Sequence, residues 1–105
     1  MKQSYYVYAI ELNSAVIKNK KFSKKNPKYI SGRPCVYIGQ SAWEPAIRFA
    51  QHKNGYKSNR FAKKYGKQLL PGIFENYNPI TTRANAIKQE KLLAIKLRKF
   101  KVDFY

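Results

Sequence analysis

The stretch YYVYAIEL, residues 5–12, is rich in aromatic and β-branched side chains and predicts a β-strand. A second strand is predicted for the sequence CVYIG at residues 35–39. Residues 18–28 hold six lysines and a proline, so we expect an exposed excursion that joins two antiparallel strands. This excursion is too long for a tight hairpin turn, and it gives a lysine-rich insertion at about residues 13–33.

Three helices are predicted after the second strand, over residues 45–52, about 59–65 and 83–100. The residues that support their ends are Pro45, Asn54-Gly55, Ser58 or Asn59, and Thr82. A short strand is expected around residues 73–74, after a turn at Pro71-Gly72. The sequence therefore predicts one α+β domain over residues 1–105, with a three-stranded antiparallel sheet flanked by about three helices.

The charge of the chain points to a polyanionic partner. Lys and Arg number 22 and Asp and Glu number 5, which gives a formal net charge of +17 in 105 residues. A hydrophobic fraction of 44% indicates a folded domain rather than a basic tail, and compact cations of this kind bind nucleic acid first and anionic membranes second. Cys35 and His52 are the only residues of their types, which excludes a disulfide framework and a zinc finger. With no secretory signal or membrane span in the sequence, we expect an intracellular, soluble protein.

Glu90 is the most informative residue of the last predicted helix. Ile87, Glu90, Ala94 and Leu97 are spaced by three, four and three residues, so the carboxylate lies within an apolar stripe. A charge removed from water needs a cation, a metal or hydrogen-bond donors. The stripe alone fits a structural salt bridge and a functional site equally well.

Arg48 and His52 are four residues apart and share one face of a helix. A guanidinium beside an imidazole can clamp a phosphate, although a surface cation and a helix-end histidine explain the same spacing. Tyr8 and Tyr37 lie in the two predicted strands, and their hydroxyls can meet if they project from the same face of the sheet. Periodicity alone leaves that question open.

Four segments together resemble the signature of the GIY-YIG nuclease domain. They are Val7-Tyr8, VYIG at residues 36–39, RFAQH at residues 48–52 and QEKLL at residues 89–93, in the order of the family and across nearly the whole chain. The resemblance implies that Tyr8, Tyr37, Arg48 and Glu90 line one catalytic face, with His52 beside them. It also implies that Glu90 binds a divalent metal, Mg²⁺ or Mn²⁺.

The function implied is a divalent-metal-dependent endonuclease that hydrolyses phosphodiester bonds in DNA. In this hypothesis Arg48 pairs with non-bridging oxygens, either tyrosine orients or deprotonates the water with its pKa lowered by the cationic site, and His52 carries a proton. The alternative is a catalytically inactive, basic nucleic-acid-binding module with the same fold, and an anionic-membrane binder is the weakest candidate. A protein partner can supply specificity. The expected nucleic-acid contacts are Lys20, Lys21, Lys24, Lys25, Lys57, Arg60, Lys63 and Lys64.

Overall fold

A four-stranded sheet forms the centre of the computed structural model, which describes residues 3–25, 35–99 and 103–104. The strands are β1 (Tyr6–Leu12), β2 (Cys35–Ser41), β3 (Gly66–Leu69) and β4 (Asp103–Phe104), in the spatial order β3-β1-β2-β4. β1 pairs antiparallel with β2 and β3, while the two-residue β4 runs parallel to β2. The α+β class and the antiparallel sheet of three strands are confirmed, and β4 adds a short edge.

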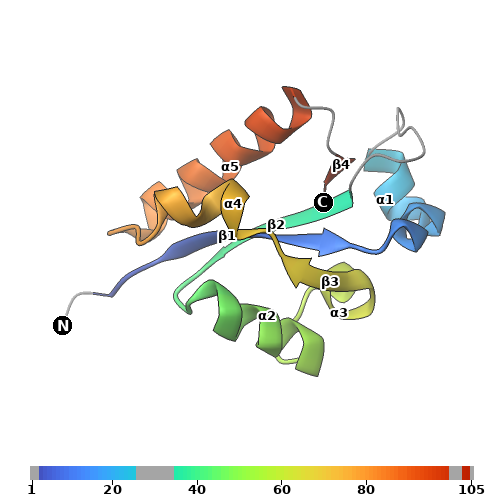
Figure 1. Ribbon diagram of the computed structural model, residues 1–105, viewed down its shortest axis with the longest axis horizontal. Coiled ribbons are helices and arrows are strands. Elements are labelled where there is room, and N and C mark those ends of the chain that lie inside the picture. Colours follow the sequence, from blue (N-terminus) through green and yellow to red (C-terminus); the bar gives the residue numbers. More distant parts are fainter. Residues whose placement is uncertain (1–2, 26–34, 100–102, 105) are drawn as a thin grey trace.

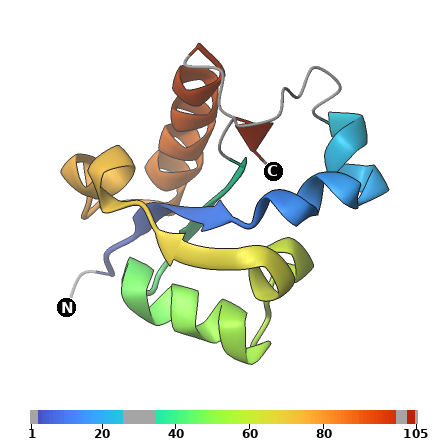
Figure 2. The ribbon, with the colours of Figure 1, turned by 45° about the vertical axis from the view of Figure 1, so that its right-hand side comes forward.

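Helices cover both faces of this sheet. Figures 1 and 2 show α2 (Pro45–Asn54) and α3 (Arg60–Tyr65) on one face and the long α5 (Arg83–Lys99) on the opposite face. Residues 70–80 follow the edge of β1 beyond β3, as α4 (Pro71–Phe74) and the 3-10 turn η2 (Glu75–Tyr77). Side chains of β1 and β2 therefore meet α2 and α3 on one face of the sheet and α5 on the other.

The helix ends follow the capping chemistry that the sequence predicts. Pro45 occupies the first turn of α2, and Gly55 ends it in the left-handed region with a φ of 85°. The Asn59 side chain accepts hydrogen bonds from the first amides of α3. Thr82 Oγ1 accepts from the Asn85 amide at 3.1 Å and so caps α5. The expected end of the last helix at Phe100 lies outside the described residues.

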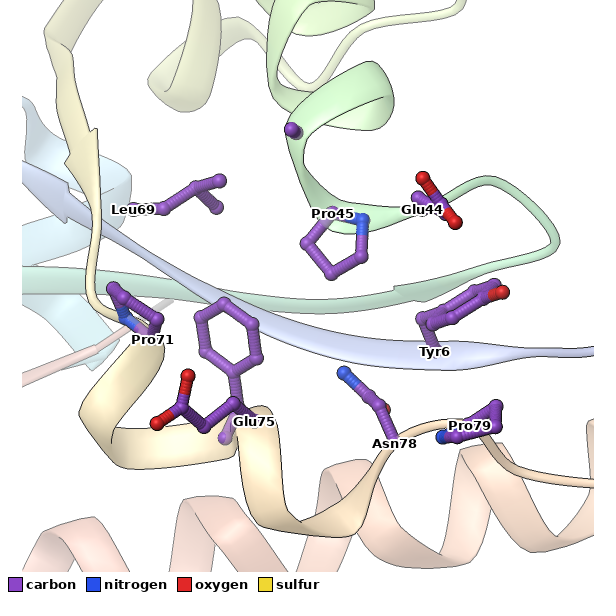
Figure 3. A pocket seen from close by; sticks show the side chains of 10 residues that line it. Tyr6, Glu44, Pro45, Leu69, Pro71, Glu75, Asn78 and Pro79 are labelled. Atoms are coloured by element: carbon purple, nitrogen blue, oxygen red, sulfur yellow. The ribbon is translucent and has the colours of Figure 1, made fainter.

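The strand expected around residues 73–74 is wrong. Those residues form α4, because Pro71 is preorganised for a first helical turn, and the third strand is β3 instead. Beyond the end of β3, a side chain takes the place of a strand partner for the backbone of β1. The Asn78 side chain accepts a hydrogen bond from the Val7 amide at 2.9 Å and donates one to the Val7 carbonyl at 2.8 Å. This segment and the start of α2 enclose a cavity of about 430 Å³ beside Tyr6 (Figure 3).

The lysine-rich insertion is also more structured than the expected exposed excursion. It contains the 3-10 helix η1 (Ser14–Lys18) and the helix α1 (Lys20–Lys25). Val16 and Phe22 are fully buried, and Phe22 packs edge-on against Phe61 of α3 with ring centroids 6.2 Å apart. Burial of these two side chains anchors the segment, because it offsets the cost of ordering the chain between the lysines. Lys28 and the remainder of the insertion to residue 33 lie outside the described residues.

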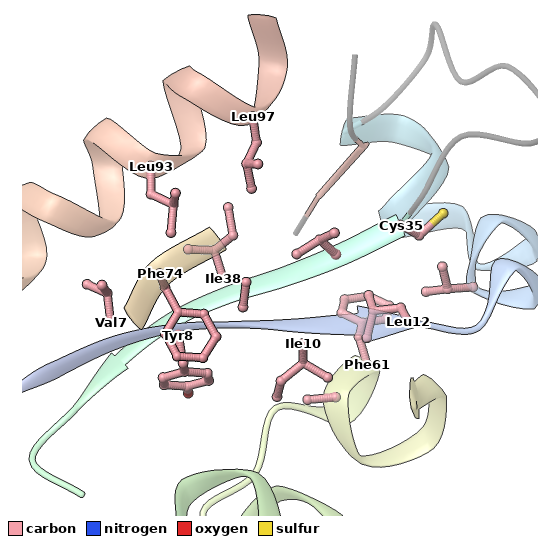
Figure 4. Packing of buried hydrophobic residues seen from close by; sticks show 14 of the residues in the cluster. Val7, Tyr8, Ile10, Leu12, Cys35, Ile38, Phe61, Phe74, Leu93 and Leu97 are labelled. Carbon is pink, nitrogen blue, oxygen red and sulfur yellow. The ribbon is translucent and has the colours of Figure 1, made fainter. Parts of the chain in front are cut away.

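The hydrophobic core is divided between the two faces of the sheet. Figure 4 shows Val7 and Ile38 directed toward Leu93 and Leu97 of α5, and Tyr8 and Ile10 directed toward the opposite face. On α5 the buried positions are Ala86, Leu93 and Leu97, with Glu90 half-buried among them. Ile87 is 40% exposed, so its place in the expected stripe is wrong. The spacing of four, three and four residues from Ala86 still places Glu90 on the sheet side of the helix.

Candidate active site

The register of the central strands brings the two motif tyrosines together. Tyr8 lies opposite Gly39, and Ile10 lies opposite Tyr37. Residues opposite one another in a sheet project to the same face, and so do residues two apart on one strand. Tyr37 therefore shares the face of Tyr8, and their ring centroids are 6.2 Å apart. The question that periodicity left open is settled by this register.

Gly39 makes room for the Tyr8 ring. A Cβ atom at position 39 would lie 2.5 Å from Tyr8 Oη and 2.6 Å from Tyr8 Cζ, well inside van der Waals contact. The ring thus passes directly over the backbone of the neighbouring strand, where only a hydrogen atom fits. The glycine is needed for space at this position.

His52 connects α2 to the tyrosines. Its Nε2 lies 2.9 Å from Tyr8 Oη, and its ring is edge-on to Tyr37 at 5.4 Å. The backbone amide of Asn59 donates to His52 Nδ1 at 3.1 Å. Because Nδ1 accepts this bond, the neutral ring carries its proton on Nε2 and donates it to Tyr8. The tautomer of His52 is therefore set by the residue that caps the next helix.

Burial keeps His52 neutral. The side chain is fully buried, and burial, with a further contribution from the Arg48 charge, lowers the pKa of the imidazole from 6.5 to about 4. A histidine that carries a proton during the reaction was expected from the sequence. The structure instead has a neutral imidazole with both ring nitrogens engaged, and this geometry suits a residue that positions Tyr8.

Arg48 organises the turn that follows α2. Its guanidinium donates to the carbonyls of Tyr56 at 3.1 Å and Lys57 at 2.7 Å, and to Gln51 Oε1 at 3.0 Å. Lys57 has a φ of 41°, so these bonds hold a turn in the left-handed region that side chains seldom adopt. The Arg48 guanidinium also acts on the Tyr8 hydroxyl, whose pKa it lowers. The arginine expected at the site is there, and it has a second, structural role.

Tyr8 differs from the sequence-based expectation in its acidity. Its side chain is only 1% exposed, and burial raises the pKa of the hydroxyl above its ordinary value of 10. Tyr37 raises this pKa further, whereas Arg48 lowers it, and burial is the largest of these effects. The expectation that the cationic site lowers the pKa is therefore wrong for Tyr8. Tyr37 is half-buried and lies nearer the surface.

Directional hydrogen bonds link these groups. Tyr8 Oη accepts the His52 proton, so its own proton is available to Tyr37, whose side chain lies within hydrogen-bonding reach. This series of linked groups starts with the Asn59 amide and passes through His52 and Tyr8 to Tyr37. Each step holds the next side chain in one orientation. We call these three side chains, His52, Tyr8 and Tyr37, the tyrosine relay.

The expectation that Glu90 lines one catalytic face with Tyr8, Tyr37 and Arg48 is not met. Glu90 lies on α5, which covers the face of the sheet opposite α2 (Figure 1). Within residues 3–25, 35–99 and 103–104, no three His, Cys, Asp or Glu side chains form a metal-binding group. A site here would fit a hard cation that takes one carboxylate and keeps several waters, which is the usual coordination of Mg²⁺.

Exposed cations border the relay on the side of α3. Lys57, Arg60, Lys63 and Lys64 are all exposed, and three of them lie over aromatic rings that restrict their side chains. Lys20, Lys21 and Lys24 are exposed on α1, while the side chain of Lys25 lies outside the described part. The basic residues expected at a nucleic-acid surface thus lie on two separate helices and the turn before α3.

Two contributions to the site had no sequence signal. Asn59 was expected only as a helix cap, and its backbone amide also fixes the His52 tautomer. Arg48 donates to the backbone carbonyls of Tyr56 and Lys57. Every residue type has such a carbonyl, so the sequence gives no sign of these bonds.

Comparisons of the chain with family models, curated proteins and solved structures give no match. In the described part of the chain, no helix combines the length and the apolar character of a membrane span.

Proposed function

We propose that this protein is a divalent-metal-dependent endonuclease of the GIY-YIG type that hydrolyses phosphodiester bonds in DNA. The observation that carries the proposal is the convergence of Tyr8, Tyr37 and His52, with Arg48 in reach, from segments separated by up to 44 residues. These residue types are the ones that the motif resemblance requires, and the net charge of +17 favours a polyanionic substrate.

Tyr37 is the tyrosine that acts on the substrate in this proposal. It is half-buried, whereas Tyr8 and His52 have almost no exposed surface. The neutral His52 and the protonated Tyr8 hold the Tyr37 hydroxyl in place, so that it orients the attacking water or a phosphoryl oxygen. Arg48 stabilises negative charge on the non-bridging oxygens, as its guanidinium has five N–H donors.

Glu90 would hold the metal, either Mg²⁺ or Mn²⁺. When bound, such an ion would supply Lewis-acid stabilisation to a phosphate at α5, on the face of the sheet opposite Arg48. Glu90 is on the sheet side of α5, and a single carboxylate with water and phosphate oxygens is sufficient for this class of ion. DNA as substrate implies an intracellular location, and a protein partner can add site specificity.

The test is cleavage of labelled single-stranded, nicked, branched and duplex DNA with Mg²⁺, Mn²⁺ or EDTA. Cleavage should require the metal, and Glu90→Gln should abolish it while binding at moderate salt persists, because the phosphate-contacting cations remain. Glu11→Gln is the matched control: this carboxylate accepts from Gln68 at 2.8 Å and lies 4.0 Å from Lys67. Activity in EDTA, or full activity of Glu90→Gln, would contradict the metal assignment.

A second candidate is a catalytically inactive nucleic-acid-binding module. The burial of Tyr8 and the use of Arg48 donors by backbone carbonyls favour it, since both groups then serve the fold. The two candidates differ in Tyr37→Phe. Loss of cleavage with unchanged binding supports the nuclease, and tight binding without cleavage of any substrate supports the module.

A further inference from the structure

The cavity beside Tyr6 has chemistry unlike the rest of this basic protein. Its walls are apolar and come from β1, β3, the start of α2 and the segment after α4, with Tyr6, Leu69, Pro45 and Phe74 among them. A volume of about 430 Å³ is within the range of small-molecule sites. Flat, apolar walls of this kind suit an aromatic ring.

Two of the five acidic residues of the chain line this cavity. Figure 3 shows the carboxylates of Glu44 and Glu75 on opposite sides of it. Glu44 stands at the N-cap of α2, yet its side chain makes no capping bond. In the described part of the chain neither carboxylate has a hydrogen bond or an ion pair. The two carboxylates therefore offer hydrogen-bond acceptors to a ligand that carries donor groups.

The third polar side chain in the wall is already engaged. Asn78 pairs with both the amide and the carbonyl of Val7, which fixes its orientation. Specificity in the cavity is thus left to the two carboxylates and the Tyr6 side chain. A ligand that matches them has flat apolar faces and at least one amino group on its edge.

The cavity adjoins the tyrosine relay along two elements. Tyr6, Tyr8 and Ile10 share a face of β1, and Tyr37 lies opposite Ile10, so Tyr6 and Tyr37 are separated by about 13 Å along the strand. On α2 the Glu44 carbonyl accepts from the Arg48 amide at 2.9 Å, so that the cavity rim and Arg48 lie one helical turn apart. One polynucleotide strand can therefore place a phosphate at the relay and a base a few nucleotides away in the cavity.

We infer that this cavity binds an unpaired nucleobase with an exocyclic amino group, cytosine, adenine or guanine, on the same strand as the phosphate at the relay. The inference rests on the proposed function for its choice of ligand. Carboxylates accept from the amino group of cytosine in known base contacts, and rings stack on aromatic and apolar side chains. Thymine has a carbonyl oxygen in place of the amino group, so its ring N–H is the only donor on that edge, and the carboxylates repel the oxygens on either side of it.

A paired base cannot enter a concave site without leaving its stack. The inference therefore also selects a substrate class. Single-stranded DNA, or duplex with an unpaired base near the scissile bond, is preferred over intact duplex.

The test compares labelled oligo(dT) with the same oligonucleotide carrying one central dC, by fluorescence anisotropy in EDTA. The dC probe should bind at least about fivefold more tightly, the lower range for one specific base contact. Glu44→Gln and Glu75→Gln, both at exposed positions, should each remove this preference, because an amide can also donate to thymine. Glu11→Gln should keep it. Equal affinity for the two probes, or equal loss in Glu11→Gln, would overturn the inference.

Cleavage of the same probes with Mg²⁺ separates this inference from the proposed function. Cleavage without any dC preference overturns the base site and leaves the nuclease. A dC preference that depends on Glu44 and Glu75, without cleavage of any substrate, retains the base site and favours the binding module. No binding to either probe overturns both.

Discussion

Acid should destabilise this protein through His52. The unfolded imidazole has a pKa of 6.5, and burial lowers the folded value to about 4. Between these values the unfolded state binds more protons than the folded state, so stability is lost as the pH falls. Protonation in the folded state would also break the bond from the Asn59 amide to Nδ1 and place a cation beside Arg48.

The two pKa values set the size of the effect. Relative to pH 7, the free energy of unfolding should fall by about 2 kcal/mol at pH 5 and about 3 kcal/mol at pH 4 from this one group. That is a large fraction of the stability of a small domain. Below pH 4 both states are protonated, and the contribution becomes constant.

The assay is urea unfolding at pH 7, 6, 5 and 4, followed by circular dichroism, for the wild type and His52→Gln. Glutamine keeps a polar group near Tyr8 and does not titrate, so the difference between the two proteins isolates His52 from the carboxylates. The wild type should lose its advantage over the variant as the pH falls. Parallel curves would refute the reasoning. Should the variant fail to fold, NMR of the imidazole nitrogens in the wild type must show a neutral ring with the proton on Nε2 at pH 6.

Three further predictions concern the relay and the lysines. Gly39→Ala should lower the free energy of unfolding by about 1–3 kcal/mol, because the added Cβ displaces Tyr8. Gly72→Ala should cost far less, because the space around position 72 is open. Equal shifts in the melting temperature of the two variants would contradict this. Tyr8→Phe should cost about 1–3 kcal/mol by leaving the His52 N–H unpaired. Tyr37→Phe should cost less stability, because Tyr37 is half-buried and water can replace its hydroxyl beside Tyr8, and it should lower cleavage at least about a hundredfold; identical profiles would refute the division of roles. Replacing Lys20, Lys21, Lys24 and Lys25 by Ser should lower the slope of log affinity against log salt by about two to four, and an unaltered slope would favour the cations of α3.

The sequence correctly predicted the elements that depend on short-range patterns of side chains. The strand at residues 6–12 and the caps at Pro45, Asn59 and Thr82 depend on side chains within a few residues of each other. β3 was missed because GKQL has only one large apolar side chain, and its strand conformation comes from pairing with β1. Val16 and Phe22 were obscured by the surrounding lysines, although both complete the core.

The grouping of four predicted residues was foreseeable from the sequence, whereas the position of Glu90 on the opposite face and the electrostatics were not. The motifs identified Tyr8, Tyr37, Arg48 and His52, which the structure brings together. The direction of the pKa shifts depends on burial, which arises when β1, β2 and α2 pack. No local pattern shows that His52 is enclosed or that a distant amide occupies its Nδ1.

The tyrosine relay is a costly way to join a helix to a sheet, and this cost favours a functional role for it. Two buried polar side chains, His52 and Tyr8, stand where apolar residues of similar size would pack without any need for hydrogen bonds. Their bonds stabilise the fold only while every partner is in place, so each substitution should cost more than its own contact. What the arrangement gains over an apolar core is a fixed orientation for a hydroxyl near the surface. Local departures from the best packing of this kind are concentrated at functional sites, and the relay ends at Tyr37, beside the arginine and the cations that a phosphate would meet.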